Sequence, residues 1–143
     1  MEPFALKTPT HRRKVVSRMI QEVPLLLLVE DDLNSLYMME RYTRSSGCRP
    51  LGTTKGGNVL ALARKERPDV ILLDLMLPDI LGWEVLQALR ADPVTRDIPV
   101  IICTALNEAD RAREAGAGYL HKPIYYQDFL SALEEAGIKP PSV

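Results

Sequence analysis

The sequence has little cysteine and no long apolar run, and these shortages exclude several classes of protein. Its 143 residues include only two cysteines, Cys48 and Cys103, and neither lies in a metal-ligand spacing. The apolar run 24–29 is far too short to span a bilayer. The amino terminus has basic residues but lacks the continuous apolar stretch and cleavage site of a secretory signal. We therefore expect a cytoplasmic protein in which Cys103 is a small core residue.

The chain also lacks an excess of charge of either sign. Its formal net charge is −1, so the molecule as a whole gives no electrostatic reason to bind nucleic acid or a membrane surface. Hydrophobic residues make up 46% of the chain and charged residues 26%, which is ordinary for a soluble globular protein. Length and composition together predict one domain, with room for a short appendage, and neither nucleic-acid binding nor membrane insertion.

Short apolar runs alternate with amphipathic stretches along most of the chain. Strands are predicted at 25–29, 49–53, 70–74, 99–103 and 118–121. Helices are predicted at 33–46, 57–65, 83–90, 107–115 and 127–136. This alternation predicts an α/β fold, a flavodoxin-like doubly wound sheet of five parallel strands in the order 2-1-3-4-5 with helices on both faces.

Acidic residues follow the first and third predicted strands at the points where these strands end. Glu30 and Asp31 follow the first strand, and Asp74 closes the third. The carboxyl ends of parallel strands share one edge of the sheet, and carboxylates within a few Å of one another repel. Mg²⁺ resolves such repulsion with hard oxygen ligands. We predict Asp31 and Asp74 as ligands, Glu30 acting through water, and the Met76 backbone carbonyl as a further protein ligand.

Two more polar residues are expected at the same edge. Thr104 follows the fourth strand and offers a hydroxyl, and Lys122 follows the fifth and offers a compact positive charge. An Asp carboxylate is a competent nucleophile towards phosphorus when cations neutralise the phosphoryl oxygens. The set predicts an aspartyl phosphate at Asp74. Taken singly, each residue also has an ordinary interpretation, as a helix cap, a strand-end hydroxyl or a solvated lysine.

The chain resembles the receiver domain of two-component response regulators over roughly residues 25–136. The resemblance is carried by LVEDD at 28–32, LDLMLPD at 73–79 with Gly82, PVIICTA at 99–105 and GYLHKP at 118–123. It implies that Asp74 accepts phosphate from a histidine kinase or a histidine phosphotransfer protein. It also implies that Glu30 and Asp31 lie at the Mg²⁺ site and that Thr104 and Lys122 contact the phosphoryl group.

The resemblance extends to a switch position and a backbone isomer. Tyr119 stands at the family's aromatic switch position, so Thr104 and Tyr119 are expected to relay phosphorylation to a partner-binding surface. The Lys122–Pro123 bond matches the family's cis peptide. However, the interval from Thr104 to Tyr119 is shorter than expected for the family by about one helical turn. We therefore expect a short or irregular helix at 107–115, which places a standard signalling surface in doubt.

The chain divides into a receiver domain at 24–137, a basic amino-terminal extension at 1–23 and a tail at 138–143. No output domain follows the last helix, so the chain resembles single-domain, chemotaxis-regulator-like proteins that act by binding a downstream protein. The extension carries five basic residues against two acidic ones. Its apolar residues Val15, Val16, Met19, Ile20 and Val23 recur at helical spacing, which predicts a basic amphipathic helix that could dock a partner, an anionic surface or the receiver itself.

Two other functions fit parts of this pattern. A phosphatase of the haloacid-dehalogenase type would need a second Asp two residues after its nucleophile, where this chain has Met76. A pseudo-receiver would keep the site and act only as a phosphorylation-independent protein-binding module. We expect a phospho-acceptor signalling domain rather than an enzyme. Met76 and Leu106 flank the expected path of water and cannot orient it, so we expect slow hydrolysis of the phosphoryl group.

Overall fold

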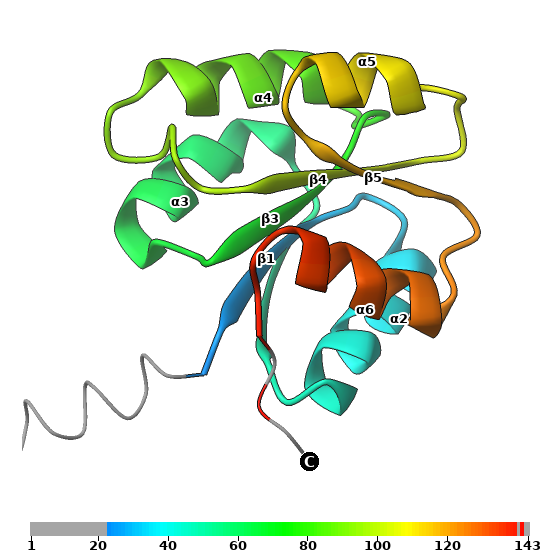
Figure 1. Ribbon diagram of the computed structural model, residues 1–143. Coiled ribbons are helices and arrows are strands. Elements are labelled where there is room, and N and C mark those ends of the chain that lie inside the picture. Colours follow the sequence, from blue (N-terminus) through cyan, green and yellow to red (C-terminus); the bar gives the residue numbers. More distant parts are fainter. Residues whose placement is uncertain (1–22, 140, 142–143) are drawn as a thin grey trace, which may run out of the picture.

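The computed structural model describes residues 23–139 and 141, so the amphipathic helix predicted for residues 1–22 lies outside the described residues. Strands and helices alternate along the chain (Figure 1). The strands are β1 (Leu25–Val29), β2 (Arg49–Thr53), β3 (Val70–Asp74), β4 (Val100–Thr104) and β5 (Gly118–His121). The helices are α2 (Leu33–Ser45), η2 (Gly56–Asn58), α3 (Val59–Glu66), α4 (Gly82–Ala91), α5 (Ala109–Glu114) and α6 (Tyr126–Glu135).

The five strands form one parallel sheet in the order β2-β1-β3-β4-β5, which confirms the predicted fold and strand order. Every residue of β1, β3 and β4 is buried, because these strands lie inside the sheet and have helices on both faces. The edge strands β2 and β5 are partly exposed, in keeping with their less apolar sequences.

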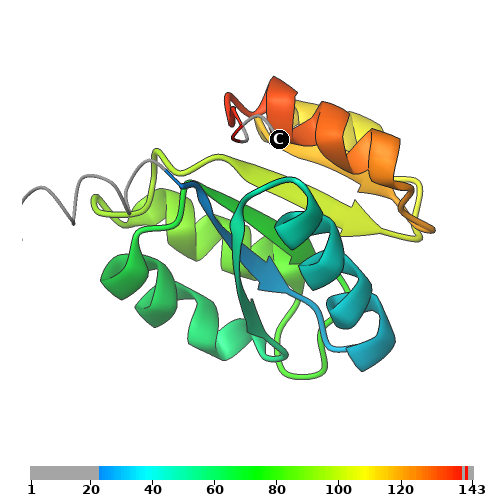
Figure 2. The same cartoon turned by 90° about the horizontal axis from the view of Figure 1, so that it is seen from below.

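Helices cover the two faces of the sheet in separate layers. Helices α3, α4 and α5 lie on one face, and α2 and α6 lie on the other (Figures 1 and 2). Successive strand residues alternate between the two cores, so Leu27 packs with Val85 and Leu89 of α4, whereas Leu26 packs with Phe129 of α6. Cys103 is buried in the second core, as predicted.

The structure corrects the start of the second predicted helix. Residues 57–65 were expected to be one α-helix, but the chain first makes a 3₁₀ turn, η2, before α3 begins at Val59. A Cβ atom at Gly56 would lie 2.3 Å from Ile80 Cγ2 and 2.9 Å from Leu77 Cδ1. This close approach of the backbone to the loop after β3 accompanies the tighter turn.

Helix α5 has six residues, which confirms the short helix predicted between β4 and β5. Ile138, at the start of the predicted tail, is buried in the core beneath α6. Within the described part of the chain, no helix combines the length and the apolarity that crossing a membrane requires.

Candidate functional site

Five chemically active side chains follow four strand ends at one edge of the sheet. The register of the parallel strands brings this about, since Asp74 lies beside Cys103 and Thr104 lies beside His121, the residue before Lys122. Glu30 and Asp31 come directly after β1, the other neighbour of β3. The sheet therefore brings residues from Glu30 to Lys122, which are far apart in the sequence, into one crevice.

Three carboxylates form the acidic part of this crevice. One oxygen atom from each of Glu30, Asp31 and Asp74 lies within 4.8 Å of the others. Glu30 is 1% exposed and Asp74 is 4% exposed, whereas Asp31 is open to solvent. Hard oxygen donors at this spacing, with one of them facing water, fit a Mg²⁺ ion that keeps part of its hydration shell.

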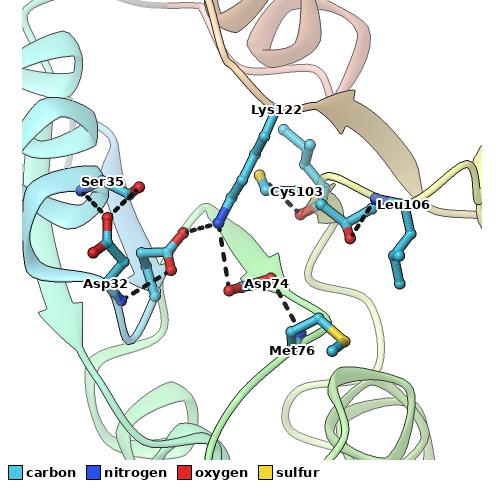
Figure 3. Close-up of polar contacts among 10 residues, drawn as sticks. Asp32, Ser35, Asp74, Met76, Cys103, Leu106 and Lys122 are labelled. Carbon is cyan, nitrogen blue, oxygen red and sulfur yellow. Dashed lines mark hydrogen bonds and ion pairs between the residues drawn. The ribbon is translucent and has the colours of Figure 1, made fainter.

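Lys122 reaches into the same crevice from the end of β5. Its Nζ donates to Glu30 Oε1 and lies 3.4 Å from Asp74 Oδ2 (Figure 3). The lysine side chain is 23% exposed, which leaves it far less hydrated than a surface lysine. One ammonium group therefore bridges two buried carboxylates, and it offsets the cost of burying them together.

Burial and ion pairing change the acidity of this cluster. Burial raises the pKa of Glu30 to about 7, even though hydrogen bonds from Lys122 and from the Asp32 backbone oppose the rise. Burial works against the ammonium form of Lys122, but the hydrogen bond and charge of Glu30, together with Asp74, outweigh it and raise the Lys122 pKa. Lys122 is therefore the fixed cation of the site.

The backbone after β3 holds the Asp74 carboxylate in place. Asp74 Oδ1 accepts a hydrogen bond of 3.1 Å from the Met76 backbone N–H (Figure 3). A Cβ atom at Gly82 would lie 2.6 Å from both the Asp74 carbonyl oxygen and Leu75 Cα. Glycine at this position thus lets the start of α4 pack directly against the backbone that carries Asp74.

Asp79 is a structural residue of the site loop that the sequence interpretation missed. Its carboxylate accepts hydrogen bonds from the backbone N–H groups of Gly56 (3.0 Å) and Gly57 (2.8 Å). These bonds, above all the one from Gly57, lower the Asp79 pKa. The loop after β3 is thereby tied to the turn before α3. Its place in the Leu-Pro-Asp turn was visible in sequence, but its distant partners were not.

Asp32 was the third acidic residue after β1, and the structure gives it a different role from its neighbours. Its carboxylate caps α2 by accepting hydrogen bonds from the Ser35 N–H (2.9 Å) and the Ser35 hydroxyl (2.7 Å). Its own backbone N–H donates to Glu30 Oε2 at 3.1 Å. The Asp32 backbone thus helps to orient the Glu30 carboxylate. An Asp immediately before a predicted helix at Leu33 was the available signal.

Thr104 and Tyr119 attach to the same loop between β4 and α5. The Thr104 side chain is fully buried, and its Oγ1 accepts a hydrogen bond of 3.1 Å from the Leu106 N–H. The Tyr119 hydroxyl donates to the Leu106 carbonyl and accepts from the Glu108 N–H at 3.3 Å. Leu106 therefore stands between the two residues. The Lys122–Pro123 peptide that follows β5 is cis, the isomer implied by the resemblance.

The profile of the response regulator receiver domain matches residues 26–134, which is most of the chain. The chain belongs to this family. It is 34% identical over 113 residues to the polar-differentiation response regulator DivK of Brucella anthropi, covering 76% of this chain and 92% of DivK. It is 33% identical over 112 residues to the protein PilH of Pseudomonas aeruginosa, covering 76% and 93%. Because these relatives are covered almost throughout, this receiver resembles stand-alone regulators.

Solved receiver structures share the fold. The chemotaxis protein CheY4 of Vibrio cholerae superposes with a TM-score of 0.74 at 25% identity, covering 80% of this chain and 98% of that one. The receiver domain of the sensor histidine kinase PA1611 of Pseudomonas aeruginosa superposes with a TM-score of 0.72 at 29% identity, covering 80% and 98%. That structure has a magnesium ion coordinated in its active-site cleft.

Proposed function

We propose that this receiver accepts a phosphoryl group at Asp74, in a Mg²⁺-dependent reaction, from the phosphohistidine of a histidine kinase or a histidine phosphotransfer protein. One observation carries this proposal. The buried Asp74 carboxylate shares its crevice with Glu30 and Asp31, and the Lys122 Nζ lies 3.4 Å from its Oδ2. A nucleophile, a cation and a set of hard oxygen ligands thus converge on one small volume, as phosphoryl transfer requires.

The transfer exchanges one bond to phosphorus for another. A carboxylate oxygen of Asp74 attacks phosphorus, the P–N bond to the donor imidazole breaks, and its electron pair stays on the imidazole nitrogen. Lys122 neutralises charge on the phosphoryl oxygens, while the Met76 N–H keeps the Asp74 carboxylate oriented. Asp31 and Asp74, with Glu30 through water and the Met76 carbonyl, would hold Mg²⁺, which supplies further neutralisation of the phosphoryl oxygens when bound.

The phosphorylated form is proposed to persist long enough to act as a signal. Met76 is 60% exposed and its backbone N–H donates to Asp74 (Figure 3), whereas Leu106, 44% exposed, lies in the loop that follows the neighbouring strand β4. Leu106 has no hydrogen-bonding group and the Met76 thioether is only a weak acceptor, so neither side chain orients a water molecule for attack on phosphorus. A phospho-acceptor of this kind works as a cytoplasmic signalling module for a downstream protein rather than as an enzyme that turns over a substrate.

Phosphorylation is proposed to switch the loop that Thr104 and Tyr119 share. If the Thr104 hydroxyl donates to a phosphoryl oxygen, it moves towards Asp74, and its bond with the Leu106 N–H is the contact that changes. The loop then follows Thr104, and Tyr119 must give up or re-form its two bonds to that loop. The surface built by α5 and β5 would change accordingly and bind its partner differently.

Intact-protein mass spectrometry after incubation with acetyl phosphate and Mg²⁺ tests the acceptance step. The wild-type chain should gain one phosphate, and Asp74→Asn should gain none. Asp97→Asn, which alters an exposed loop aspartate outside the site, is the matched control and should behave as the wild type. A folded protein that gains no phosphate under any donor would favour the phosphorylation-independent binding module instead.

Amide hydrogen exchange with a beryllofluoride phosphoryl mimic tests the switch separately. Changes in protection should concentrate in residues 104–122 and should weaken in Thr104→Ala. Changes confined to the neighbourhood of Asp31 and Asp74 would show that the mimic binds without moving the loop, and they would remove Thr104 and Tyr119 from the proposal.

A further inference from the structure

A shallow groove runs along the exposed edge of the sheet, between β5 and the carboxyl end of α6. It has a volume of about 340 Å³, and its lining mixes polar groups with small apolar side chains, among them Pro99, Val100, Gly118, Tyr119, Ala132 and Glu135. We call it the β5 groove. Among the described residues, β5 pairs with β4 alone, so its outer edge presents backbone groups that no described strand covers. Proteins commonly protect such edges by covering them with another segment.

The charge at the end of α6 runs against the helix dipole. Glu134 and Glu135 are exposed in the last turn, where the partial charge is already negative, and that turn has no basic residue. The four other α-helices of the described residues each carry an arginine in the last turn. Within residues 23–139, no ion pair reaches Glu134 or Glu135. This end of α6 would therefore be stabilised by a basic segment.

We propose that residues 1–22 of the same chain dock in the β5 groove as a basic amphipathic segment. This segment holds five of the chain's 18 basic residues and only two of its 19 acidic ones. Its apolar residues Val15, Val16, Met19 and Ile20 would contact the small apolar side chains of the groove, while neighbouring arginines would face Glu135 in its lining. The remainder of the chain has more acidic than basic residues, so the attraction is mutual.

The point where the segment joins the domain favours docking within one chain. Leu27, two residues into β1, lies beside Ile71 of β3, and Ile71 lies beside Val100 of β4, which lines the groove, so Leu27 is two strand spacings from the groove. Two spacings amount to about 10 Å. A helical stretch of 14 residues of the amino-terminal segment would extend about 21 Å, which is longer than this separation. The start of β1 and the carboxyl end of α6 also lie towards the same end of the molecule in both views (Figures 1 and 2).

A second copy of the chain is a less favoured occupant, because a tethered segment competes at a high effective concentration. The groove lies at the amino ends of β4 and β5, away from the carboxyl ends that carry Asp74 and Lys122. Docking therefore leaves the phosphoryl site open, while Tyr119, which the proposed switch moves, also lines the groove.

Paramagnetic relaxation in the full-length chain tests this docking. A spin label at Ser17→Cys can be attached selectively, since Cys48 and Cys103 are both buried. In the ¹⁵N-labelled chain, we expect the label to broaden amide signals at residues 116–118 and 132–136. A sample mixing spin-labelled ¹⁴N chains with unlabelled ¹⁵N chains should show no such broadening. Broadening in the mixed sample alone, on another face of the domain, or nowhere would overturn the proposal.

Charge reversal gives an independent test of the same contact. Glu135→Lys should lower the equilibrium constant for docking about twofold to fivefold, as expected when an exposed ion pair is lost and repulsion is added. Combining Glu135→Lys with Arg12→Glu and Arg13→Glu should restore part of the broadening. Glu66→Lys, at the exposed end of α3, makes the same charge change elsewhere and should leave the broadening unchanged. Equal effects of Glu135→Lys and Glu66→Lys would show that the contact is not made at α6.

Discussion

Removing the lysine that bridges two buried carboxylates should separate metal binding from phosphoryl transfer. In the structure, the Lys122 Nζ contacts Glu30 and Asp74, which are also proposed to face Mg²⁺. The ammonium group and the metal ion therefore share carboxylates and repel each other. Lys122→Ala should tighten Mg²⁺ binding and, at the same time, slow phosphorylation. A residue that served only to hold the fold together would not move these two quantities in opposite directions.

The size of both effects follows from the geometry. Two unit charges 3.4 Å apart interact by about 5 kcal/mol at an effective dielectric constant of 20, and desolvation consumes part of that energy. Losing one preorganised positive group at a reacting phosphoryl oxygen typically slows a reaction by about a hundredfold, or about 2.7 kcal/mol. For Mg²⁺, relief of repulsion and competition should lower the dissociation constant about tenfold, or about 1.4 kcal/mol.

Calorimetric Mg²⁺ titration and the initial rate of labelling by acetyl phosphate measure the two quantities on the same samples. Lys65→Ala removes an exposed lysine from α3 and is the matched control, which should change neither quantity. Weaker Mg²⁺ binding in Lys122→Ala would contradict the competition that the geometry indicates. A phosphorylation rate equal to that of the wild type would remove Lys122 from the transfer step.

Three further predictions concern the metal ligands and the loops behind the site. Asp31→Ala should raise the Mg²⁺ dissociation constant at least about tenfold in the same titration. Because Asp31 is exposed, the urea midpoint of unfolding should stay nearly unchanged. An unchanged Mg²⁺ affinity would exclude Asp31 as a ligand. Gly82→Ala should lower the free energy of unfolding by about 2 kcal/mol or more in urea titrations, because the added Cβ would meet backbone atoms. In the control Gly57→Ala, the added Cβ would meet only the Asp79 carboxylate at 3.1 Å, so the loss of stability should be clearly smaller. Equal losses in the two variants would refute the packing argument. Hydrogen bonds from Gly57 and Gly56 lower the Asp79 pKa, so the stability contributed by its charged form is complete above the unfolded-state pKa and is lost as pH falls through the folded-state pKa. The stability difference between the wild type and Asp79→Asn should therefore shrink as pH falls below about 4, the ordinary aspartate pKa, and a difference that stays constant there would contradict the assignment.

The sheet could be predicted from the sequence because its central strands have an unusual pattern. Residues 25–29 and 70–73 are continuously apolar, which is typical of strands buried on both faces, and a parallel sheet flanked by helices is the arrangement that buries such strands. The positions of the acidic residues followed, since parallel strands must end at the same edge. The short α5 was also predictable, because the interval before Tyr119 leaves few residues for a helix.

Other features depend on contacts between distant residues, which the sequence does not display. The 3₁₀ turn at Gly56–Asn58 accompanies close packing against Leu77 and Ile80. Asp79 binds backbone groups more than 20 positions away. The position of Lys122 at the site edge was predictable, but its contact with Glu30 was not, because a flexible lysine side chain can reach several partners.

The most direct test of the central proposal is chemical trapping of the phosphorylated residue. Borohydride reduces an aspartyl phosphate to homoserine, so peptide mass spectrometry can identify the acceptor after incubation with acetyl phosphate and Mg²⁺. We predict homoserine at position 74 in the wild type, none when Mg²⁺ is chelated, and none in Asp74→Asn. Homoserine at Asp31 or another carboxylate, or an unmodified Asp74 in a folded chain that binds Mg²⁺, would contradict phosphoryl acceptance at Asp74.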